Sequence, residues 1–257
     1  MKLLVYIWTI LKILKNVLVN HEEWRNLPEA SLLNCCAFLN QDQKIIRIDL
    51  HCISDDPKKD TCLAPKSIEQ IISTLLKKYP SIKHFDLTTD TTSKEFKAVS
   101  VFFRIAKIVK KYKVSILMAT FGPGHGKFLI DPSGKIWRCE YDRNCVGKIG
   151  VKAANMSEVA NYFNTFFSKP KHSCSKISER ITLETPSVLH TLSQWESLPE
   201  TTRHFCYLFL PSQPNKVYQR RYPCGTCNHC TSRQFLQCLD EYCGKWNGPF
   251  KFKKKKK

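Results

Sequence analysis

Apolar residues recur with two different periods in the middle of the chain. Residues 44–54 (KIIRIDLHCIS) are rich in β-branched side chains and partly alternate, which predicts a strand. Isoleucine and leucine then recur at helical spacing between Pro65 and Tyr79, and a proline suits the first turn of a helix. The pattern therefore predicts a strand followed by a helix.

The alternation of strand and helix continues to residue 120. Residues 82–89 predict a second strand, and residues 93–113 predict a long amphipathic helix with its lysines outward. Residues 114–120 contain no charge, which is typical of a parallel strand covered on both faces. The order of these elements predicts an α/β fold with a parallel β-α-β-α-β portion.

Outside this core the pattern is weaker. The N-terminal apolar stretch is interrupted by Lys12 and Lys15 and is shorter than the roughly 20 residues of a membrane span, so we expect a helix packed on the body. The alternative is a signal peptide or a membrane anchor. Five segments are predicted: an N-terminal apolar helical segment at 1–43, the α/β core at 44–150, a connector of helix and strand at 151–217, a cysteine-rich module at 218–250, and a polylysine tail at 251–257.

The composition indicates a folded, basic protein. Of the 257 residues, 42% are hydrophobic and 11% aromatic, which excludes a disordered chain. Lysine and arginine number 41 against 22 acidic residues, a net charge of +19, and only six of these positive charges lie in 251–257. A basic body favours polyanionic partners, so we expect nucleic acid, with DNA favoured, in the nucleus or cytoplasm. We expect neither a small-molecule substrate nor a membrane as partner.

Five of the thirteen cysteines fall in one twenty-residue window. They are Cys224, Cys227, Cys230, Cys238 and Cys243. The others are scattered, mostly in apolar surroundings such as those of Cys35, Cys36, Cys52 and Cys206, and an odd total argues against complete disulfide pairing. We interpret the scattered cysteines as small buried side chains in a reducing compartment, and the cluster as metal ligands.

The cysteine cluster has the spacing of a structural zinc site. A C-x2-C turn directs two thiolates at one ion, and two further ligands complete a tetrahedron. We favour Cys224, Cys227, Cys238 and Cys243 as the zinc ligands, with Cys230 and His229 as alternates. The alternative is a set of free or disulfide-bonded cysteines. Neighbouring aromatic and basic side chains suit either nucleic-acid contact or the core of a module that folds around its metal.

Acidic residues and a glycine-rich turn follow the predicted strands. In parallel sheets functional groups collect at the carboxyl ends of the strands, and carboxylates there can hold Mg²⁺. The alternative is that these residues only cap helices and form turns. The residues concerned are Asp55, Asp56, Asp90, His125, Lys127 and Asp131.

Three stretches of the sequence carry a family resemblance. They are ISDDPKKD (53–60), IKHFDLTTDTTSKEFK (82–97), and HGK (125–127) with Asp131 and Gly134. Together with the cysteine-rich ending, they resemble the ISDD, SDG…SQFKN and SHGKG…DG.GG motifs of uncharacterised proteins encoded by eukaryotic mobile elements. The resemblance covers roughly residues 44–248 and implies an RNase H-like core of the transposase and integrase kind.

The resemblance also implies a catalytic site of three acids. In that fold one acid lies on the first strand, a second ends the fourth strand, and a third lies on a helix beyond the fifth. Asp90 would be the second acid and Asp131 the third, with His125 and Lys127 beside it. Mg²⁺ would bind only if the site is active, with Asp55 and Asp56 as further cofactor-binding candidates.

Several positions depart from the family pattern. The glycine after the second acid is Thr91, and the glycine after the third is Pro132, which a helix tolerates only at its start. The first acid has no counterpart in the N-terminal segment, and the candidates for a third carboxylate are Asp49, Asp55 and Asp56. Because two-metal chemistry needs the complete set, we expect a catalytically inactive nucleic-acid-binding protein. The alternative is a secreted or membrane-associated basic protein.

Overall fold

Strands and helices alternate along most of the chain that the computed structural model describes. The described residues are 3–14, 29–56, 61–89, 96–120, 130–141, 143, 156–169, 177–186, 194–201, 203–224 and 227–255. The strands are β1 (Leu3–Leu14), β2 (Glu29–Gln41), β3 (Lys44–Ser54), β4 (His84–Thr89), β5 (Ser115–Thr120), β6 (Glu179–Glu184), β7 (Cys206–Phe209), β8 (Lys216–Arg220) and β9 (Asn247–Lys251). The helices are α1 (Leu63–Lys78), α2 (Val99–Tyr112), α3 (Ile130–Tyr141), α4 (Met156–Ser168), α5 (Asn228–Thr231) and the 3-10 helix η4 (Phe235–Gln237).

All nine strands join one mixed sheet, in the order β6-β3-β2-β1-β4-β5-β7-β8-β9. β1, β2 and β3 pair as antiparallel neighbours, whereas β4 pairs parallel with β1 and β5 parallel with β4. The strands β3, β1, β4 and β5 therefore run in the same direction. The predicted α/β class is confirmed, but the parallel portion is interrupted, because β3 pairs with β2 and β6 and not with β4.

The described parts of the N-terminal segment, residues 3–14 and 29–41, form strands, so the prediction of an apolar helix there was wrong. β1 lies between β2 and β4, and β2 continues into β3 through a turn at Asp42 and Gln43, both with positive φ. The physical reason is visible in the sequence of β1, LLVYIWTILKIL, whose apolar run of β-branched and aromatic residues suits a central strand better than a one-sided helix. Among the described residues, no helix is both long enough and apolar enough to cross a bilayer.

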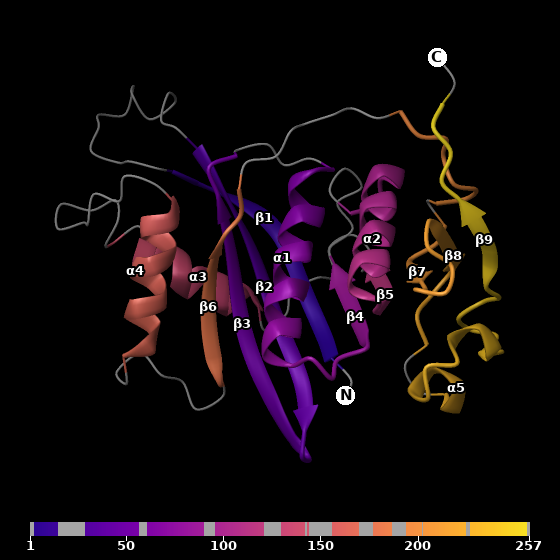
Figure 1. Ribbon diagram of the computed structural model, residues 1–257, viewed down its shortest axis with the longest axis horizontal. Coiled ribbons are helices and arrows are strands. Elements are labelled where there is room, and N and C mark those ends of the chain that lie inside the picture. The colour runs from indigo at the N-terminus through magenta and orange to yellow at the C-terminus, as the bar shows by residue number, and fades with distance from the viewer. Residues whose placement is uncertain are drawn as a thin grey trace.

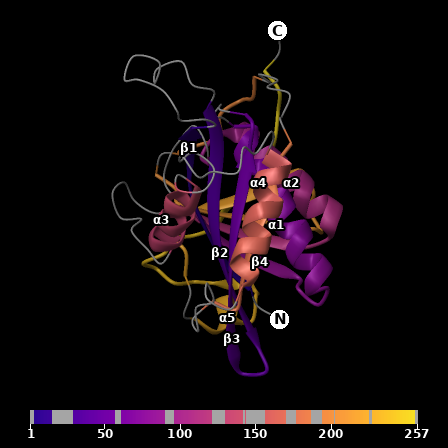
Figure 2. The same ribbon diagram turned by 90° about the vertical axis from the view of Figure 1, so that its left-hand side faces the viewer.

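Helices α1 and α2 cover one face of the sheet, which we call the first face. Figure 2 shows these two helices on the opposite side of the strands from α3. Both present an apolar side to the strands: Ile68, Ile71, Ile72 and Leu75 from α1, and Phe102, Ile105 and Val109 from α2. Burial of this main core provides the hydrophobic driving force for docking the helices.

On the second face lie α3 and, at the other end of the sheet, the cysteine module, while α4 packs against α3 beside the edge strand β6 (Figure 1). Trp137 of α3 stacks on Phe163 of α4 with 4.4 Å between ring centroids, and both side chains are fully buried. At the far end, Leu117 and Leu208 of the sheet pack against Phe235 of η4. The sheet is thus sandwiched between two helix layers, and its strands have apolar side chains on both faces.

A buried polar network connects α3 to β2 and β3 on the second face. The fully buried Asp49 carboxylate accepts hydrogen bonds from Arg47 at 2.8 and 3.0 Å, from Ser133 at 2.6 Å and from the Cys36 thiol at 3.2 Å. Arg47 lies on β3, Cys36 on β2 and Ser133 on α3. The negative charge of Asp49 is therefore compensated where it is buried. Asp49 therefore fixes the position of α3 on the sheet.

The C-terminal lysines are part of the fold as far as residue 255, so the prediction of a polylysine tail separate from the body needs correction. Phe252 packs against the main core and meets the Phe103 ring edge-on at 5.8 Å. Lys254 then pairs with Trp195 in an antiparallel bridge, with backbone hydrogen bonds on either side of it. The aromatic residues between the lysines anchor this segment.

Gly134 allows the close approach of α3 to β2. A Cβ atom added there would overlap the side-chain amide of the buried Asn34. We expect Gly134→Ala to lower the free energy of unfolding by about 1–3 kcal/mol through overpacking, measured by urea denaturation. Lys135→Ala, at the exposed neighbouring position, is the control and should stay within about 0.5 kcal/mol of the wild type; equal effects would contradict the packing argument.

His51 makes stability depend on pH. Its Nδ1 lies 2.8 Å from Asn34 Oδ1, and burial lowers the pKa of His51 to about 4. Between pH 6.5 and 4 the unfolded chain takes up a proton at this histidine and the folded chain does not. We therefore expect stability to fall as the pH falls through this window, by up to about 3 kcal/mol from this group. In His51→Gln, chemical denaturation at a series of pH values should show a shallower fall; an unchanged slope would contradict the assignment.

Candidate metal centre and the carboxyl edge of the sheet

Four cysteine sulfur atoms converge beneath the end of β8. Cys224 follows β8, Cys227 caps the N-terminus of α5, Cys230 lies in α5, and Cys238 follows η4. Their Sγ atoms all lie within 4.8 Å of one another, and those of Cys227 and Cys238 are 3.5 Å apart. In a tetrahedral thiolate site with metal–sulfur bonds of about 2.3 Å, the sulfur atoms are about 3.8 Å apart. The four cysteines can therefore hold a metal ion.

Local hydrogen bonds favour a thiolate at one of the four cysteines, Cys238. The N–H group of Cys230 donates to Cys227 Sγ at 3.4 Å, as expected when the first cysteine of a C-x2-C turn caps a short helix. Burial opposes ionisation of Cys238, but hydrogen bonds from the Asp240 backbone and from Arg220 outweigh it and lower the pKa of Cys238 to about 6. Burial raises the pKa of Cys230. Cys230 is therefore protonated at neutral pH unless a bound cation stabilises its thiolate.

Arg220 places a buried positive charge beside these sulfur atoms. Its side chain is fully buried, its Nη2 lies 3.8 Å from Cys230 Sγ, and its guanidinium is 4.4 Å from the centroid of the Trp246 ring. Its Nε and Nη1 have no hydrogen-bond partner within the described part of the chain. A buried cation is costly without a compensating anion, and four thiolates around a divalent ion carry a net negative charge. The donor set and the guanidinium together fit a metal–thiolate centre.

The four-cysteine group differs from the favoured ligand set in one member. Cys230, the alternate, takes the place of Cys243, which instead forms an overlapping group with Cys224 and Asp240. Asp240 Oδ1 accepts the backbone N–H of Cys243 at 3.3 Å, so this carboxylate organises the turn that ends the module. His229, the other alternate, is exposed, and its Nδ1 lies 3.5 Å from Gln234 Oε1. The eleven cysteines in the described ranges are all free thiols.

The scattered cysteines are buried as predicted. Cys35, Cys36, Cys52 and Cys206 are each at most 2% exposed. Burial raises the pKa of Cys52 and of Cys206 to about 12, so these thiols are protonated at neutral pH. They behave as small core side chains and do not resemble the metal-binding group.

Asp55 and Asp56, the acids that follow β3, lie away from the carboxyl end of β4. Asp55 and Asp56 follow β3, where the Asp56 N–H donates to Ser54 Oγ at 3.2 Å and its carbonyl accepts from Ser31 at 2.5 Å. Through β2, Ser54 aligns with Lys12 of β1, whereas the end of β4 aligns with Ile7. Those five residues of β1 correspond to about 17 Å at about 3.3 Å per residue. Asp55 and Asp56 are therefore displaced from the end of β4.

The four catalytic candidates lie at or beyond the margins of the described residues. Asp90, His125 and Lys127 fall outside them: Asp90 directly follows the end of β4 in the sequence, and His125 and Lys127 are five and seven residues beyond the end of β5. Asp131 is the second residue of α3. Pro132 follows it within the first turn of the helix, where a proline is tolerated. α3 contacts β1, β2 and β3, so it lies over the half of the sheet that these strands form.

Asp49, one of the candidates for a third carboxylate, lies on β3 and is separated from β1 by β2. It aligns through Cys36 and Tyr6 with Thr88, two residues before Asp90. However, Asp49 is three strands away from β4. Arg47 binds both oxygens of its carboxylate, so Asp49 acts in holding the fold together. β1 itself contains neither aspartate nor glutamate.

An aromatic and cationic cluster at the carboxyl edge was only partly visible in the sequence. Phe205, whose carbonyl accepts the N–H of Thr120 at 2.8 Å, stacks with Tyr222 at 5.9 Å and an interplanar angle of 8°. Lys97 lies 4.0 Å from the Phe205 centroid, and Arg221 lies 5.2 Å from that of Tyr222. Proximity to the cysteines indicated Arg221 and Tyr222, but only the tertiary structure adds Lys97 and Phe205.

This cluster borders a hollow of about 540 Å³. Arg203, His204 and Glu200 complete its lining together with Phe205, Arg221 and Tyr222. Stacked rings flanked by cations are the arrangement on which nucleic-acid bases stack while phosphates are neutralised. The hollow thus combines two aromatic rings with the cationic side chains of Arg203 and Arg221.

Comparison with known proteins gives one family. A model described as Domain of unknown function (DUF8701) matches residues 19–222, which includes β2 to β8 and ends just before Cys224. No curated protein and no solved structure matches.

Single cysteine substitutions distinguish the four-cysteine group from the overlapping one. With Co²⁺ as a spectroscopic probe, we expect the wild type to give a tetrahedral thiolate spectrum at one equivalent. Cys230→Ser should weaken Co²⁺ binding by at least about tenfold. It removes a direct ligand, and even changes to the groups that surround the ligands reduce metal affinity by about that factor. Cys243→Ser should retain the spectrum. The exposed Cys139→Ser is the control; equal losses for Cys230→Ser and Cys139→Ser would contradict the site.

Proposed function

The chain belongs to the family of the Domain of unknown function (DUF8701), and we propose that it is a nucleic-acid-binding protein derived from a mobile-element transposase or integrase and lacking catalytic activity. The observation that carries the binding proposal is the cluster of Lys97, Phe205, Arg221 and Tyr222 at the carboxyl edge. DNA is the favoured partner, in the nucleus or cytoplasm.

The arrangement of the first five strands supports an RNase H-like core. The fold implied by the sequence resemblance requires acids on the first strand, at the end of the fourth, and on a helix after the fifth. Here β1 pairs directly with β4, and α3, which follows β5, contacts β1. The three positions therefore belong to elements that adjoin one another, although the sequence places no acid on β1.

The incomplete set of metal-binding carboxylates supports the proposal that the chain lacks catalytic activity. Two-metal phosphodiester cleavage needs several oxygen ligands around two ions about 3.5–4 Å apart. β1 supplies no carboxylate, Asp49 is neutralised by Arg47, and Asp55 and Asp56 are displaced along the strand direction. Asp90 and Asp131 alone do not make up the set.

Zinc is the ion that suits the cysteine cluster. Four thiolates and tetrahedral spacing favour Zn²⁺ over Mg²⁺ or Ca²⁺, which prefer oxygen ligands. The site would be structural, because all four positions are occupied by protein. Its cysteines hold together a segment whose secondary structure is limited to α5, η4 and β9.

Binding and cleavage assays test the proposal. We expect the full chain to bind a labelled DNA oligonucleotide with an affinity that falls steeply with salt concentration, measured by fluorescence anisotropy. The double variant Arg221→Ala/Tyr222→Ala should bind about tenfold more weakly, since one stacked base is worth about 1–3 kcal/mol. Mn²⁺ or Mg²⁺ should produce no cleavage of DNA or RNA.

The matched control is Tyr242→Ala/Lys245→Ala, which removes an exposed tyrosine and an exposed cation from the same module. Its affinity should remain within twofold of the wild type. Absence of binding at low salt would refute nucleic-acid binding, and equal losses in the two double variants would refute the role of the cluster. Metal-dependent cleavage that Asp90→Asn abolishes would refute the absence of catalysis.

A further inference from the structure

A second cationic hollow lies on the first face, between α1 and α2. Its volume is about 620 Å³, and the C-terminal segment closes one side of it. Its lining residues come from α1, from α2 and from the C-terminal part of the chain, and they include Pro65, Lys66 and Glu69 of α1, Phe103, Arg104, Lys107, Ile108 and Lys111 of α2, and Trp195 and Lys254. We call this the α1–α2 groove. It lies across the sheet from the cysteine module, so it is a separate surface.

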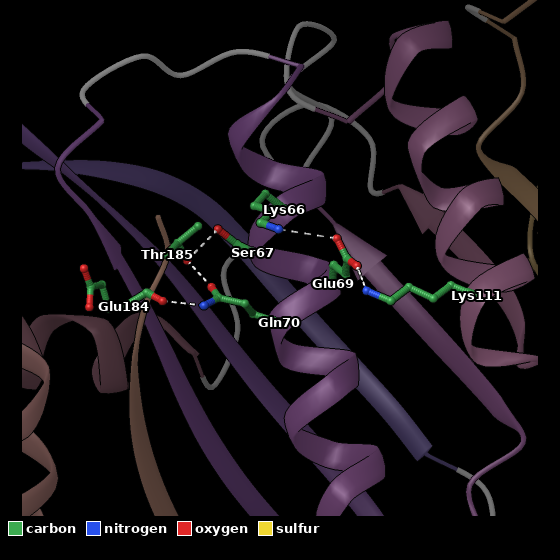
Figure 3. Close-up of polar contacts among 7 residues, drawn as sticks. All are labelled: Lys66, Ser67, Glu69, Gln70, Lys111, Glu184 and Thr185. Atoms are coloured by element: carbon green, nitrogen blue, oxygen red, sulfur yellow. Dashed lines mark hydrogen bonds and ion pairs between the residues drawn. The ribbon is translucent and has the colours of Figure 1, made fainter. Parts of the chain in front are cut away.

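The α1–α2 groove carries a strong excess of positive charge. Five cationic side chains line it against a single carboxylate, that of Glu69. Glu69 is already paired, with Lys111 Nζ at 2.6 Å and Lys66 Nζ at 3.8 Å, as Figure 3 shows. One carboxylate cannot balance this set, and clefts with walls of one charge concentrate oppositely charged ligands.

The walls of the groove are fixed by contacts outside it. On the flank of α1 turned toward β6, Thr185 donates to Gln70 Oε1 at 2.5 Å, and Ser67 Oγ lies 3.4 Å from Thr185 Oγ1 (Figure 3). Gln70 also donates to the carbonyl of Glu184. α2 is held by its buried apolar side on the first face. The cations are therefore displayed on rigid elements, which lowers the entropic cost of binding.

One wall of the groove is aromatic. Trp195 lies 4.2 Å from Phe103 between ring centroids, and Lys107 Nζ is 4.7 Å from the Phe103 centroid. Both rings are only partly buried. A free phosphate would need only the cations, whereas rings beside cations also suit a nucleic-acid base.

The C-terminal segment extends the cationic surface beyond the groove. The bridge between Trp195 and Lys254 brings the lysines at 253–255 alongside the aromatic wall. The cations thus follow a track from α2 along the end of the chain and do not close around a single point. A track fits a strand with repeating phosphates.

We propose that the α1–α2 groove binds the phosphodiester backbone of single-stranded nucleic acid, as a second contact surface on the face opposite to the cysteine module. The inference rests on the proposed nucleic-acid binding and adds where a strand lies and which strand form it takes. Lys66, Arg104, Lys107 and Lys254 neutralise phosphates, and Trp195 and Phe103 offer a stacking surface.

The test removes one exposed cation from each side of the groove. For a labelled single-stranded oligonucleotide at about 0.1 M salt, Lys107→Gln/Lys254→Gln should bind about 10- to 25-fold more weakly, and the slope of log affinity against log salt should decrease by about 1.4, from two contacts at about 0.7 each. The control, Lys110→Gln/Lys251→Gln, removes the same charge from the same helix and C-terminal segment at exposed positions outside the groove lining. It should change affinity less than threefold.

Other results would overturn the proposal. Equal losses in the groove and control variants, with normal circular dichroism, would indicate only diffuse attraction and would refute the groove while leaving nucleic-acid binding intact. Displacement of the oligonucleotide by equimolar tripolyphosphate would identify a site for small phosphates. A wild-type chain that binds no oligonucleotide at low salt would refute both this inference and the proposed function.

Discussion

The parallel pairing of β1 with β4 is the constraint on which the rest of the structure depends. β1 is also antiparallel to β2, so it joins the hairpin of β2 and β3 to the α/β units that follow. Since α1 must cross from β3 over two strands to reach β4, it lies flat on the first face, and α2 follows it there. A shift of β1 would separate the two halves of the sheet and uncover the main core.

Buried charges then organise the second face. Asp49, bound by Arg47 and Ser133, fixes α3 over β1, β2 and β3, and Arg220 fixes the cysteine module at the far end of the sheet. The two buried charges have opposite signs, but each is tolerated only with a compensating partner. For Asp49 the partner is another side chain; for Arg220 the described structure offers sulfur atoms, and a metal-bound set of thiolates would complete the compensation. Folding of the module and metal binding are coupled in this view.

The sequence predicted the elements with a strong local signal. β3 has the predicted bounds of 44–54, and α1, β4, α2 and β5 lie within a few residues of theirs, because each is marked by periodicity and by a proline or a polar turn at its end. The N-terminal strand was mistaken for a helix, since an unbroken apolar run such as LLVYIWTIL has no period of its own and only its neighbours β2 and β4 decide its form. Among the site residues, spacing identified the cysteines, but it could not choose between Cys230 and Cys243. Cys230 lies in α5 and Cys243 in the turn bound by Asp240, and only the packing of these two segments decides which of them joins the other three cysteines.

By itself, the sequence determined the charge of the chain, the clustering of its cysteines and the α/β class, because these follow from composition and local periodicity. Only the tertiary structure decided the strand order, the four-cysteine group, the burial of Arg220, and the meeting of α2 with the C-terminal lysines around Trp195. The physical reason is that these features join residues far apart along the chain. Their energies come from burial and charge compensation, which depend on how distant elements pack and leave no periodic trace in the sequence.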